Sequence, residues 1–535
     1  MLLQAADSPA VSQSAMQRIS SATSHPLFSV AATRQMEQHA AADLPAHTLM
    51  QRAGLSVARL TLALAPHAQC IWIACGPGNN GGDGFEAALQ LHQWGKKVVV
   101  TWTGLPDGKT AAPPDAEAAR QRALASGLEI SNEPPRNFDF CIDALLGLGA
   151  RLDPARPGNA MMTEWLGLMQ SSPAARLSVD VPTGLDSDTG ATNLIAACAR
   201  NTRARGVFCL SLLTLKPGLF AAQGRDAAGE VWFDELGVVP PADVAPCARL
   251  LGADHAQRAT RSSQAHASHK GSFGDVAVIG GESAPRSHMG GAALLAARAA
   301  LHAGAGRVFV ALLSTPEQTQ MTVDVMQPEL MFRSVEALDL KRHVIVCGCG
   351  GGEALKSVLA KVLSTASRAV LDADALNAIS GDTQLQTLLK ARHQRGYSTV
   401  LTPHPLEAAR LLGFNVAQVQ ASRLTAASQL AERFQCVVVL KGSGTVITGP
   451  GRVPAINSTG NALLATAGTG DALAGMVGAG IARSVQAADN DFNAVVEAVF
   501  EAVCAAVFIH GLMADSWALN KPGQTLTASL LATLQ

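Results

Sequence analysis

The chain has 535 residues, of which 48% are hydrophobic and 16% are charged, and its formal net charge is −1. This length predicts several domains, about two to four, and the apolar share argues against a disordered chain. The balanced charge lacks the basic excess of proteins that bind nucleic acids, so no nucleic-acid partner is expected.

The ten cysteines are scattered and lack the paired spacing of a zinc site, a pattern typical of reduced thiols in a cytoplasmic protein. We find no apolar run of the length that a membrane span needs. The first residues lack the charged region and apolar core of a secretory signal. We therefore expect residues 1–27 to form a loose extension and the protein to have no membrane partner.

The first half begins with apolar residues at helical spacing over 28–65, interrupted at Pro45, which predicts two helices. The apolar run 69–75 predicts a buried strand that enters the glycine-rich turn GPGNNGGDG (76–84) and then a helix. Strand, turn and helix in this order are the layout of a phosphate-binding turn in a doubly wound sheet. As a dinucleotide fingerprint the turn is weak, because the next strand does not end in the acidic residue that holds a ribose hydroxyl.

Polar oxygen groups follow three successive predicted strands of the first half. They are Asn80 and Asp83 after the first strand, Asp143 after the second, and Asp180 and Thr183 after the third. A single aspartate at such a place is more often a helix cap, but parallel strands end at a common crevice, so the series predicts one polar site. Two acids in one site require a cation or a raised pKa.

The motifs GNNGGDG, DALLGLG and VDVPTGLD resemble the N-terminal domain of the NAD(P)H-hydrate epimerases, over roughly residues 28–240. The resemblance implies a potassium ion held by Asn80, Asp143 and Thr183, where Thr183 replaces the serine of many relatives, and it implies Asp180 as the proton-transfer group. No role is transferred to residues 193–214, which depart from the family. The residues that the resemblance assigns to the hydrated nicotinamide nucleotide are Asn79, Asn80, Gly81, Gly82, Asp83, Gly147, Leu148, Gly149, Ala150, Arg151, Leu152, Asp153 and Asp180.

Residues 237–270 are rich in proline, alanine, serine, arginine and histidine, which indicates an inter-domain crossing. We expect one domain at 28–245, a linker at 246–268 and a second domain at 269–535. Strands and helices alternate throughout the second half, which predicts a parallel sheet with helices on both faces. The predicted fold is thus two three-layer αβα domains, an N-terminal Rossmann-like doubly wound sheet and a C-terminal ribokinase-like sheet.

The stretch Gly468-Thr469-Gly470-Asp471 precedes an apolar helix rich in small residues. Unpaired backbone N–H groups at such a helix start bind anions, and an aspartate is electrostatically favoured there. Lys441 and the following Gly-Ser-Gly-Thr form a second candidate phosphate cradle, although the P-loop pattern is absent. His404, between two prolines, is a loop residue with a possible catalytic role by this reasoning alone.

The motifs HKG, TPHP, LKGSGT and GTGD resemble the ribokinase-like ADP-dependent NAD(P)H-hydrate dehydratases over residues 258–535. Cys349 stands where relatives often have proline, which leaves the choice between Gly350 and Gly352 open, and Ala467 replaces a common glycine. The resemblance implies that Asp471 is the catalytic base. It assigns Lys441, Gly442, Ser443, Gly444, Thr445 and Gly470 to the adenine nucleotide, and Ala292, Gly350, His404 and Asp471 to the hydrated dinucleotide.

Together the two resemblances predict a bifunctional enzyme that repairs hydrated NADH and NADPH (NADHX and NADPHX). The first domain would interconvert the R and S epimers with K⁺, and the second would dehydrate the S epimer while ADP becomes AMP and phosphate, with Mg²⁺. A homo-oligomer is expected. Two alternatives stay open: a vitamin or small-molecule kinase with an N-terminal nucleotide-binding module, and an N-terminal sensing module without turnover.

Overall fold

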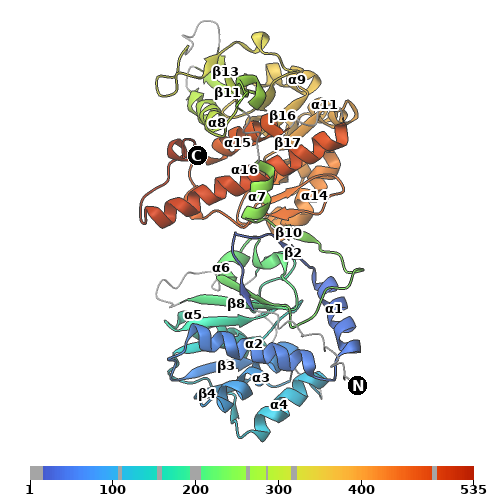
Figure 1. Cartoon of the computed structure of the whole chain (residues 1–535), viewed down its shortest axis with the longest axis vertical. Helices are drawn as coiled ribbons and strands as arrows, with labels where there is room; N and C mark the ends of the chain where they lie inside the picture. The colour runs from blue at the N-terminus through green and yellow to red at the C-terminus, as the bar shows by residue number, and fades with distance from the viewer. Residues whose placement is uncertain are drawn as a thin grey trace, which may run out of the picture. The chain divides into compact units, whose positions relative to one another are not determined.

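The computed structural model describes residues 16–105, 111–153, 159–192, 206–260, 266–284, 287–314, 322–484 and 491–534. The chain divides into two compact α/β units (Figure 1). The first unit comprises Met1–Ile19, Leu27–Leu219 and Gln223–Pro246, and the second comprises Ser20–Pro26, Phe220–Ala222 and Cys247–Gln535. The predicted α/β fold class is confirmed.

The first unit is built on an 8-stranded sheet of order β1-β9-β8-β7-β6-β3-β4-β5. All neighbouring strands are parallel except β1 and β9. The chain adds strands to one side of β3 and then returns to add β6 on the other side, so a topological switch point lies between β3 and β6. The strands are β1 (Gln17–Arg18), β3 (Ile71–Cys75), β4 (Val98–Trp102), β5 (Ile130–Ser131), β6 (Phe140–Ala144), β7 (Ala175–Val179), β8 (Val207–Leu212) and β9 (Glu230–Asp234).

β3 and β6 are buried along their whole length, which requires helices over both faces of this sheet. The two helices expected over 28–65 are confirmed as α1 and α2, whereas α3 begins at Asn79, inside the motif that we predicted to be a turn. The helices are α1 (Val30–Asp43), α2 (Thr48–Leu64), α3 (Asn79–Gln93), α4 (Pro114–Ala125), α5 (Ala160–Ser171) and α6 (Gly224–Ala228), with a 3₁₀ turn at Pro217–Leu219.

The second unit is built on a 12-stranded sheet of order β14-β13-β11-β15-β16-β17-β18-β19-β20-β10-β2, with β12 paired to β11. Its strands are β2 (His25–Leu27), β10 (Ala248–Leu250), β11 (Asp275–Ala284), β12 (Ser287–His288), β13 (Arg307–Ser314), β14 (Met331–Phe332), β15 (Val344–Cys347), β16 (Arg368–Leu371), β17 (Ser398–Leu401), β18 (Val437–Leu440), β19 (Val446–Thr448) and β20 (Ala455–Ile456). The path from β14 to β18 is parallel, as expected, but β18, β19 and β20 are antiparallel neighbours. The prediction of a parallel sheet throughout is therefore wrong at this edge, because the short connection between β18 and β19 allows a hairpin and no crossover.

Apolar side chains pack on both faces of the second sheet, one group with α8, α15 and α16 and the other with α9 to α14. The helices are α7 (Ala253–Thr260), α8 (Gly290–His302), α9 (Lys356–Thr365), α10 (Asp374–Gly381), α11 (Thr383–Gln394), α12 (Pro405–Leu412), α13 (Val416–Ala421), α14 (Arg423–Phe434), α15 (Thr469–Ser484), α16 (Phe492–Asn520) and α17 (Ala528–Leu531). Short 3₁₀ turns occupy Lys270–Phe273, Val335–Ala337 and Ala462–Leu464.

Two segments that we expected to be irregular contain regular structure. The expected linker 246–268 holds β10, which pairs with β20, and α7, whose His255 contacts Glu501 of α16 at 2.8 Å. The expected loose extension 1–27 holds β1 and β2. Residues 1–15 and 261–265 of these segments lie outside the described residues.

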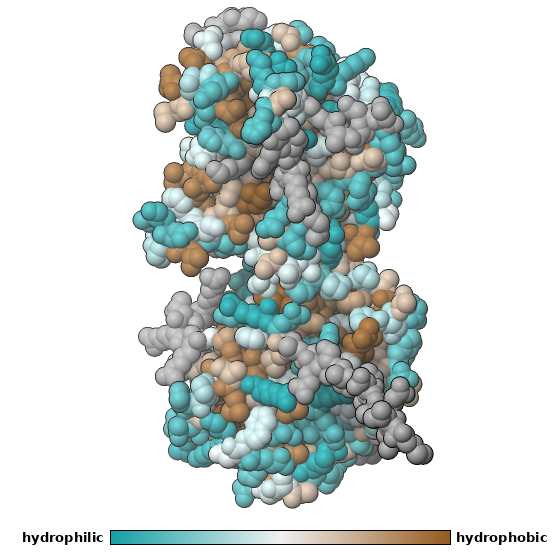
Figure 2. Space-filling model, in the orientation of Figure 1, coloured by the Kyte–Doolittle hydropathy of each residue, from teal (hydrophilic) through white to brown (hydrophobic). Residues whose placement is uncertain are grey.

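Among the described residues, α16 alone is long and apolar enough to cross a membrane by length and composition, which our search for apolar runs did not anticipate. Half of its most apolar window is buried, and it packs on α15 and α7. Burial in the domain core accounts for this composition. On the face shown in Figure 2, hydrophilic residues are interspersed with hydrophobic ones.

Candidate active sites

A cavity of about 420 Å³ lies in the first unit at the carboxyl ends of β3, β6 and β7. This is the switch-point crevice where open α/β sheets bind ligands. Of the residues predicted to hold the hydrated nucleotide, those that line the cavity are Asn79, Asn80, Asp83, Gly147, Leu148, Ala150 and Asp180.

The other predicted residues do not line this cavity. Leu152 is 3% exposed and packs in the core beside Trp72 and Trp165, while the Arg151 side chain is 84% exposed and pairs with Asp186. Gly81 has a packing role, since a Cβ there would lie 2.0 Å from the Gly76 carbonyl oxygen. Gly82, Gly149 and Asp153 likewise do not line the cavity.

The three residues expected to hold potassium come together. The Thr183 hydroxyl and N–H both donate to the Asp143 carboxyl, at 2.7 and 3.0 Å. Thr183 Oγ1 also accepts from the N–H of Leu146 in the loop after β6, and Asn80 Oδ1 would lie 2.8 Å from a Cβ at Gly147 of that loop. Asp143 is 2% exposed and forms no ion pair with a described residue. Burial raises the pKa of this carboxyl, and its hydrogen bonds to Thr183 only partly oppose that effect. A buried carboxyl, a hydroxyl and an amide oxygen fit an alkali cation.

Asp180 forms a buried ion pair with Lys216 that the sequence did not reveal. Asp180 follows β7 directly and adopts a φ of 65°, a left-handed conformation that is uncommon outside glycine. The Lys216 ammonium donates to Asp180 Oδ1 and to the Leu212 carbonyl oxygen, and the Leu212 N–H also donates to Oδ1. No donor among the described residues contacts Oδ2, so this oxygen is available to a ligand in the cavity.

Further charged groups line the same cavity, namely Arg34 and Glu37 of α1. Burial, with the Asp180 and Glu37 carboxylates, raises the pKa of Asp83 well above its usual range. The site therefore combines a buried carboxyl whose pKa is raised with a second acidic group, Asp180, that is paired with the Lys216 ammonium. Two carboxyl groups in such different environments suit acid–base chemistry.

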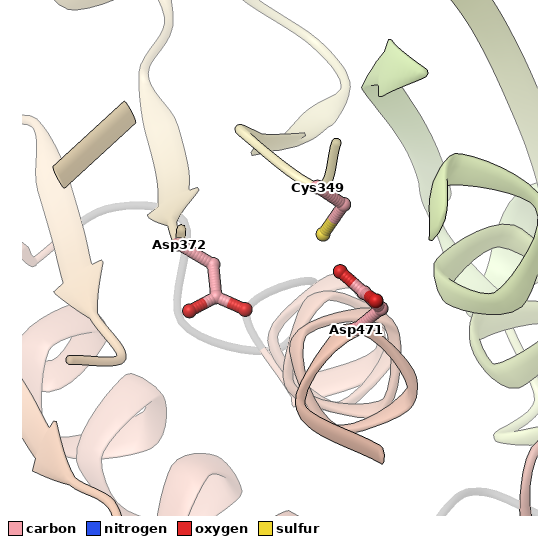
Figure 3. A group of neighbouring side chains, drawn as sticks. All are labelled: Cys349, Asp372 and Asp471. Carbon is pink, nitrogen blue, oxygen red and sulfur yellow. The ribbon is translucent and has the colours of Figure 1, made fainter. Parts of the chain in front are cut away.

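A second group of reactive side chains lies in the second unit, where β15, β16 and α15 meet (Figure 3). Ligand atoms of Cys349, Asp372 and Asp471 all lie within 4.8 Å of one another. Cys349 follows β15, Asp372 follows β16, and Asp471 belongs to the first turn of α15. The carboxyl edge of the parallel sheet thus faces the start of a helix, an arrangement that binds phosphate groups.

The two predicted phosphate-binding motifs lie together. Helix α15 begins at Thr469, and a Cβ at Gly470 would be 3.3 Å from the Lys441 Nζ atom. Lys441 in turn donates to Asp372 Oδ1 at 2.7 Å. The buried His510 of α16 donates from Nε2 to the Thr469 carbonyl oxygen at 3.0 Å and so fixes the first turn of α15.

Asp471 has the properties of a general base. Burial, and then the negative charge of Asp372, raise the pKa of Asp471 to about 6, against hydrogen bonding from the Cys349 thiol and the charge of Lys441. A carboxyl with this pKa is ionised at neutral pH and still accepts a proton readily.

The residues assigned to the hydrated dinucleotide are partly brought together. Gly350 adopts a φ of 60°, and a Cβ there would lie 3.0 Å from that of Ala292, so these two residues are in contact. His404 caps α12: its Nδ1 accepts hydrogen bonds from the Leu406 and Glu407 N–H groups. The ring is therefore oriented by a capping box, with Nε2 facing Glu407 at 3.2 Å.

Two family models match the chain. Residues 46–218 match the model described as YjeF-related protein N-terminus, and residues 276–535 match the model described as NAD(P)H-hydrate dehydratase. The bifunctional NAD(P)H-hydrate repair enzyme Nnr of Escherichia coli (strain K12) is 32% identical over 511 residues, which cover 92% of this chain and 89% of the relative. The ADP-dependent (S)-NAD(P)H-hydrate dehydratase of Neisseria meningitidis is 39% identical over 50% of this chain and 84% of the relative.

A solved structure, the ADP/ATP-dependent NAD(P)H-hydrate dehydratase from Bacillus subtilis co-crystallized with ATP/Mg²⁺, is 29% identical. It covers 52% of this chain and 93% of that chain, with a TM-score of 0.40.

Fold and sites define an enzyme with two α/β domains, each with its chemistry at the carboxyl edge of its sheet. The full-length likeness to the Escherichia coli enzyme extends over both domains. The chain belongs to the family of bifunctional NAD(P)H-hydrate repair enzymes. It epimerises the R and S hydrates and dehydrates the S hydrate at the expense of ADP, as the sequence predicted.

Proposed function

We propose that Asp180 and Lys216 perform the epimerisation and that Asp471 performs the dehydration. The observation that carries the first assignment is the buried contact between Asp180 and the Lys216 ammonium at the edge of the cavity. Epimerisation inverts the hydrated carbon, so a bond at that carbon must break and form again while a proton leaves the hydrate and returns. Asp180 Oδ2 would accept it, while Lys216 and the Leu212 N–H hold Oδ1 in place.

Asn80, Asp143 and Thr183 would hold the potassium ion beside this cavity. The ion would supply the positive charge that the buried Asp143 carboxyl lacks, and it would thereby keep the loop after Leu145 in position. Replacing K⁺ by Li⁺ is expected to weaken epimerisation, because Li⁺ is too small for a site built by three separate segments.

The second reaction transfers a phosphoryl group and then eliminates it. Asp471 takes the proton of the hydrate hydroxyl, and the hydroxyl oxygen attacks the terminal phosphorus of ADP. The bond between that phosphorus and the bridging oxygen breaks and releases AMP. Loss of phosphate from the phosphorylated carbon, with a proton from the neighbouring carbon, restores NAD(P)H.

The phosphate-binding groups for this reaction are the N–H groups at Gly470, the Lys441 ammonium and the turn Gly442–Thr445. The Asp372 carboxylate fits Mg²⁺, which would neutralise charge on the transferring phosphoryl group and leave Asp471 free to act as the base. The Cys349 thiol is a soft donor that Mg²⁺ does not favour, so it serves as a hydrogen-bond donor to Asp471.

The test uses a mixture of R and S hydrates with ADP, and it follows the absorbance of the reduced nicotinamide. The wild-type enzyme is expected to restore the whole mixture, and Asp180→Asn only the S fraction. In a parallel reaction, ATP is supplied with pyridoxal or hydroxymethylpyrimidine. Phosphorylated vitamin without recovery of NADH would show that the enzyme is a kinase and would refute the proposal.

A further inference from the structure

Arg423 is a buried cation beneath the turn that follows β18. It is the first residue of α14 and is 1% exposed. Its Nη2 donates to the carbonyl oxygens of Leu440 and Lys441, both at 3.0 Å, and its Nη1 donates to Gln420 Oε1 at 2.6 Å. The Nε atom is buried and has no hydrogen-bond partner among the described residues.

The charge of Arg423 is not neutralised within the described part of the chain. Its contacts are two carbonyls and one amide, and burial alone lowers the pKa of the guanidinium to about 10. Lys441, the cation that the sequence suggested for the same turn, differs in this respect because its ammonium is paired with Asp372 at 2.7 Å. The unpaired positive charge at this turn therefore belongs to Arg423.

The turn passes directly against the guanidinium. A Cβ at Gly442 would lie 2.9 Å from Arg423 Nη2, and Gly442 adopts a φ of 137°, so glycine permits this approach. On its other side the turn is held by the Ala222 N–H, which donates to the Ser443 carbonyl oxygen at 3.2 Å. The Arg423 guanidinium thus lies against the buried side of the backbone segment at which we place the adenine nucleotide.

Burying a charged group without a counter-charge is unfavourable, and a neutral side chain could bond the same carbonyls at a smaller desolvation cost. A buried positive charge is useful where an anion arrives during function, because Coulomb attraction is weakly screened there. ADP is such an anion.

We propose that Arg423 is a positioning residue of the adenine-nucleotide site, where its unpaired charge favours binding of the anionic phosphates of ADP. This inference rests on the proposed placement of the nucleotide at Lys441–Thr445 and Gly470. The charge acts through the backbone of the Leu440–Gly442 segment, which the guanidinium also holds in shape.

The chain offers a matched control in Arg392 of α11. It is also 1% exposed, and burial likewise lowers the pKa of its guanidinium to about 10. It donates to Thr399 Oγ1 and to three carbonyl oxygens, those of Val362, Leu363 and Ser398. Ser398 is the first residue of β17, so Arg392 lies at the amino edge of the sheet, opposite the nucleotide motifs.

The experiment measures the affinity of the full chain for adenosine, AMP and ADP by calorimetry without hydrate, in Arg423→Gln, Arg423→Lys and Arg392→Gln. We expect Arg423→Gln to lose about tenfold in ADP affinity, less for AMP and little for adenosine, because only the phosphates feel the charge. Arg423→Lys keeps the charge and is expected to stay within about threefold of wild type for ADP. Arg392→Gln is expected to lower the melting temperature and leave all three affinities unchanged.

Equal losses for ADP and adenosine in Arg423→Gln, or no loss, would overturn the proposal. If the Gln variant does not fold, Arg423→Lys decides alone, since a tenfold loss for ADP despite the retained charge would also overturn it. Gly470→Val separates this result from the placement of the nucleotide. If Gly470→Val leaves ADP affinity unchanged, the placement itself is wrong; if it abolishes binding while the Arg423 variants bind normally, only the role of Arg423 is refuted.

Discussion

Lys441 Nζ donates a hydrogen bond of 2.7 Å to Asp372 Oδ1, and this pair joins the carboxyl end of β18 to that of β16. Gly470, at the start of α15, lies against both partners. The pair therefore fixes the side of the site from which phosphate groups are bound. The Asp372 carboxylate also raises the pKa of Asp471, because two negative charges close together favour protonation of one of them.

The dehydration rate is expected to fall at acid pH as Asp471 becomes protonated. With a pKa of about 6, kcat/KM should lose about tenfold for each pH unit below that value. Asp372→Asn removes a negative charge that raises the pKa of Asp471. It also frees the Lys441 ammonium, whose positive charge lowers that pKa, so the acid limb should move to lower pH. The measurement is the pH profile of kcat/KM with purified S hydrate and ADP. An acid limb that moves upward in Asp372→Asn would contradict this account of Asp471.

Cys349→Ala is expected to move the acid limb of the pH profile of kcat/KM to higher pH. The thiol hydrogen bond favours the Asp471 carboxylate, so its loss should raise the pKa of Asp471. Cys347→Ala is the control: this thiol is equally buried, but burial alone raises its pKa and no acidic group is coupled to it. Identical profiles for both alanine variants would show that Cys349 has no electrostatic effect on Asp471.

Asp471→Asn should remove dehydration and leave epimerisation intact. Loss of a general base lowers the rate by about 10²- to 10⁴-fold, and the carboxamide keeps the size of the side chain. The two activities are measured separately, dehydration by recovery of the reduced nicotinamide and epimer exchange by chromatography of the hydrates. Loss of both activities together would indicate that the substitution disturbs more than this one site.

The positions of the sites at the sheet edges could be predicted from the sequence, because strands ending in polar or glycine-rich stretches are local patterns. That reasoning placed Asn80 and Asp180 at one cavity and Asp471 near Lys441, whereas Asp143 is buried beside Thr183 and does not line that cavity. It could not find Lys216 or Arg423, whose roles depend on burial against partners that are distant in sequence or hidden in the fold. A lysine before a proline, or an arginine at a helix start, has no signature of its own.

Leu152 and the segment 246–260 show the opposite error. Leu152 belongs to a glycine loop that resembles a binding loop, but its side chain packs on Trp72 and Trp165, which only the tertiary fold reveals. The polar composition of 246–260 suggested a linker, whereas β10 and α7 gain their stability from pairing with β20 and packing on α16. Tertiary contacts override composition in both cases.

Lys216→Met should abolish epimerisation while dehydration of purified S hydrate continues. The substitution keeps the length of the buried side chain but removes the ammonium that holds Asp180 Oδ1. It also leaves the Asp180 carboxylate without its partner, which costs several kcal/mol at a buried pair, so the first unit should melt earlier. Asp180→Asn combined with Lys216→Met removes both charges and should recover part of this stability without recovering activity. Activity in the single Lys216→Met variant would refute the role given to Lys216.

The stability of the second unit should decrease as pH falls from about 6.5 towards 4, because His510 is buried as a neutral ring. Burial, opposed by the hydrogen bond to the Thr469 carbonyl oxygen, lowers the pKa of His510 to about 4. Between these pH values the unfolded chain binds a proton at His510 that the folded chain excludes. The free energy of unfolding therefore falls by up to about 3 kcal/mol on acidification. The stability contribution is complete above the unfolded pKa and is lost as pH falls through the folded one.

His510→Gln removes the titrating group and retains a donor for Thr469. The free energy of unfolding, measured by urea denaturation at about pH 7.5 and about pH 5, should therefore differ less in this variant than in wild type. If His510→Gln keeps the full pH dependence of the wild type, proton exclusion by His510 does not set the acid stability of this unit.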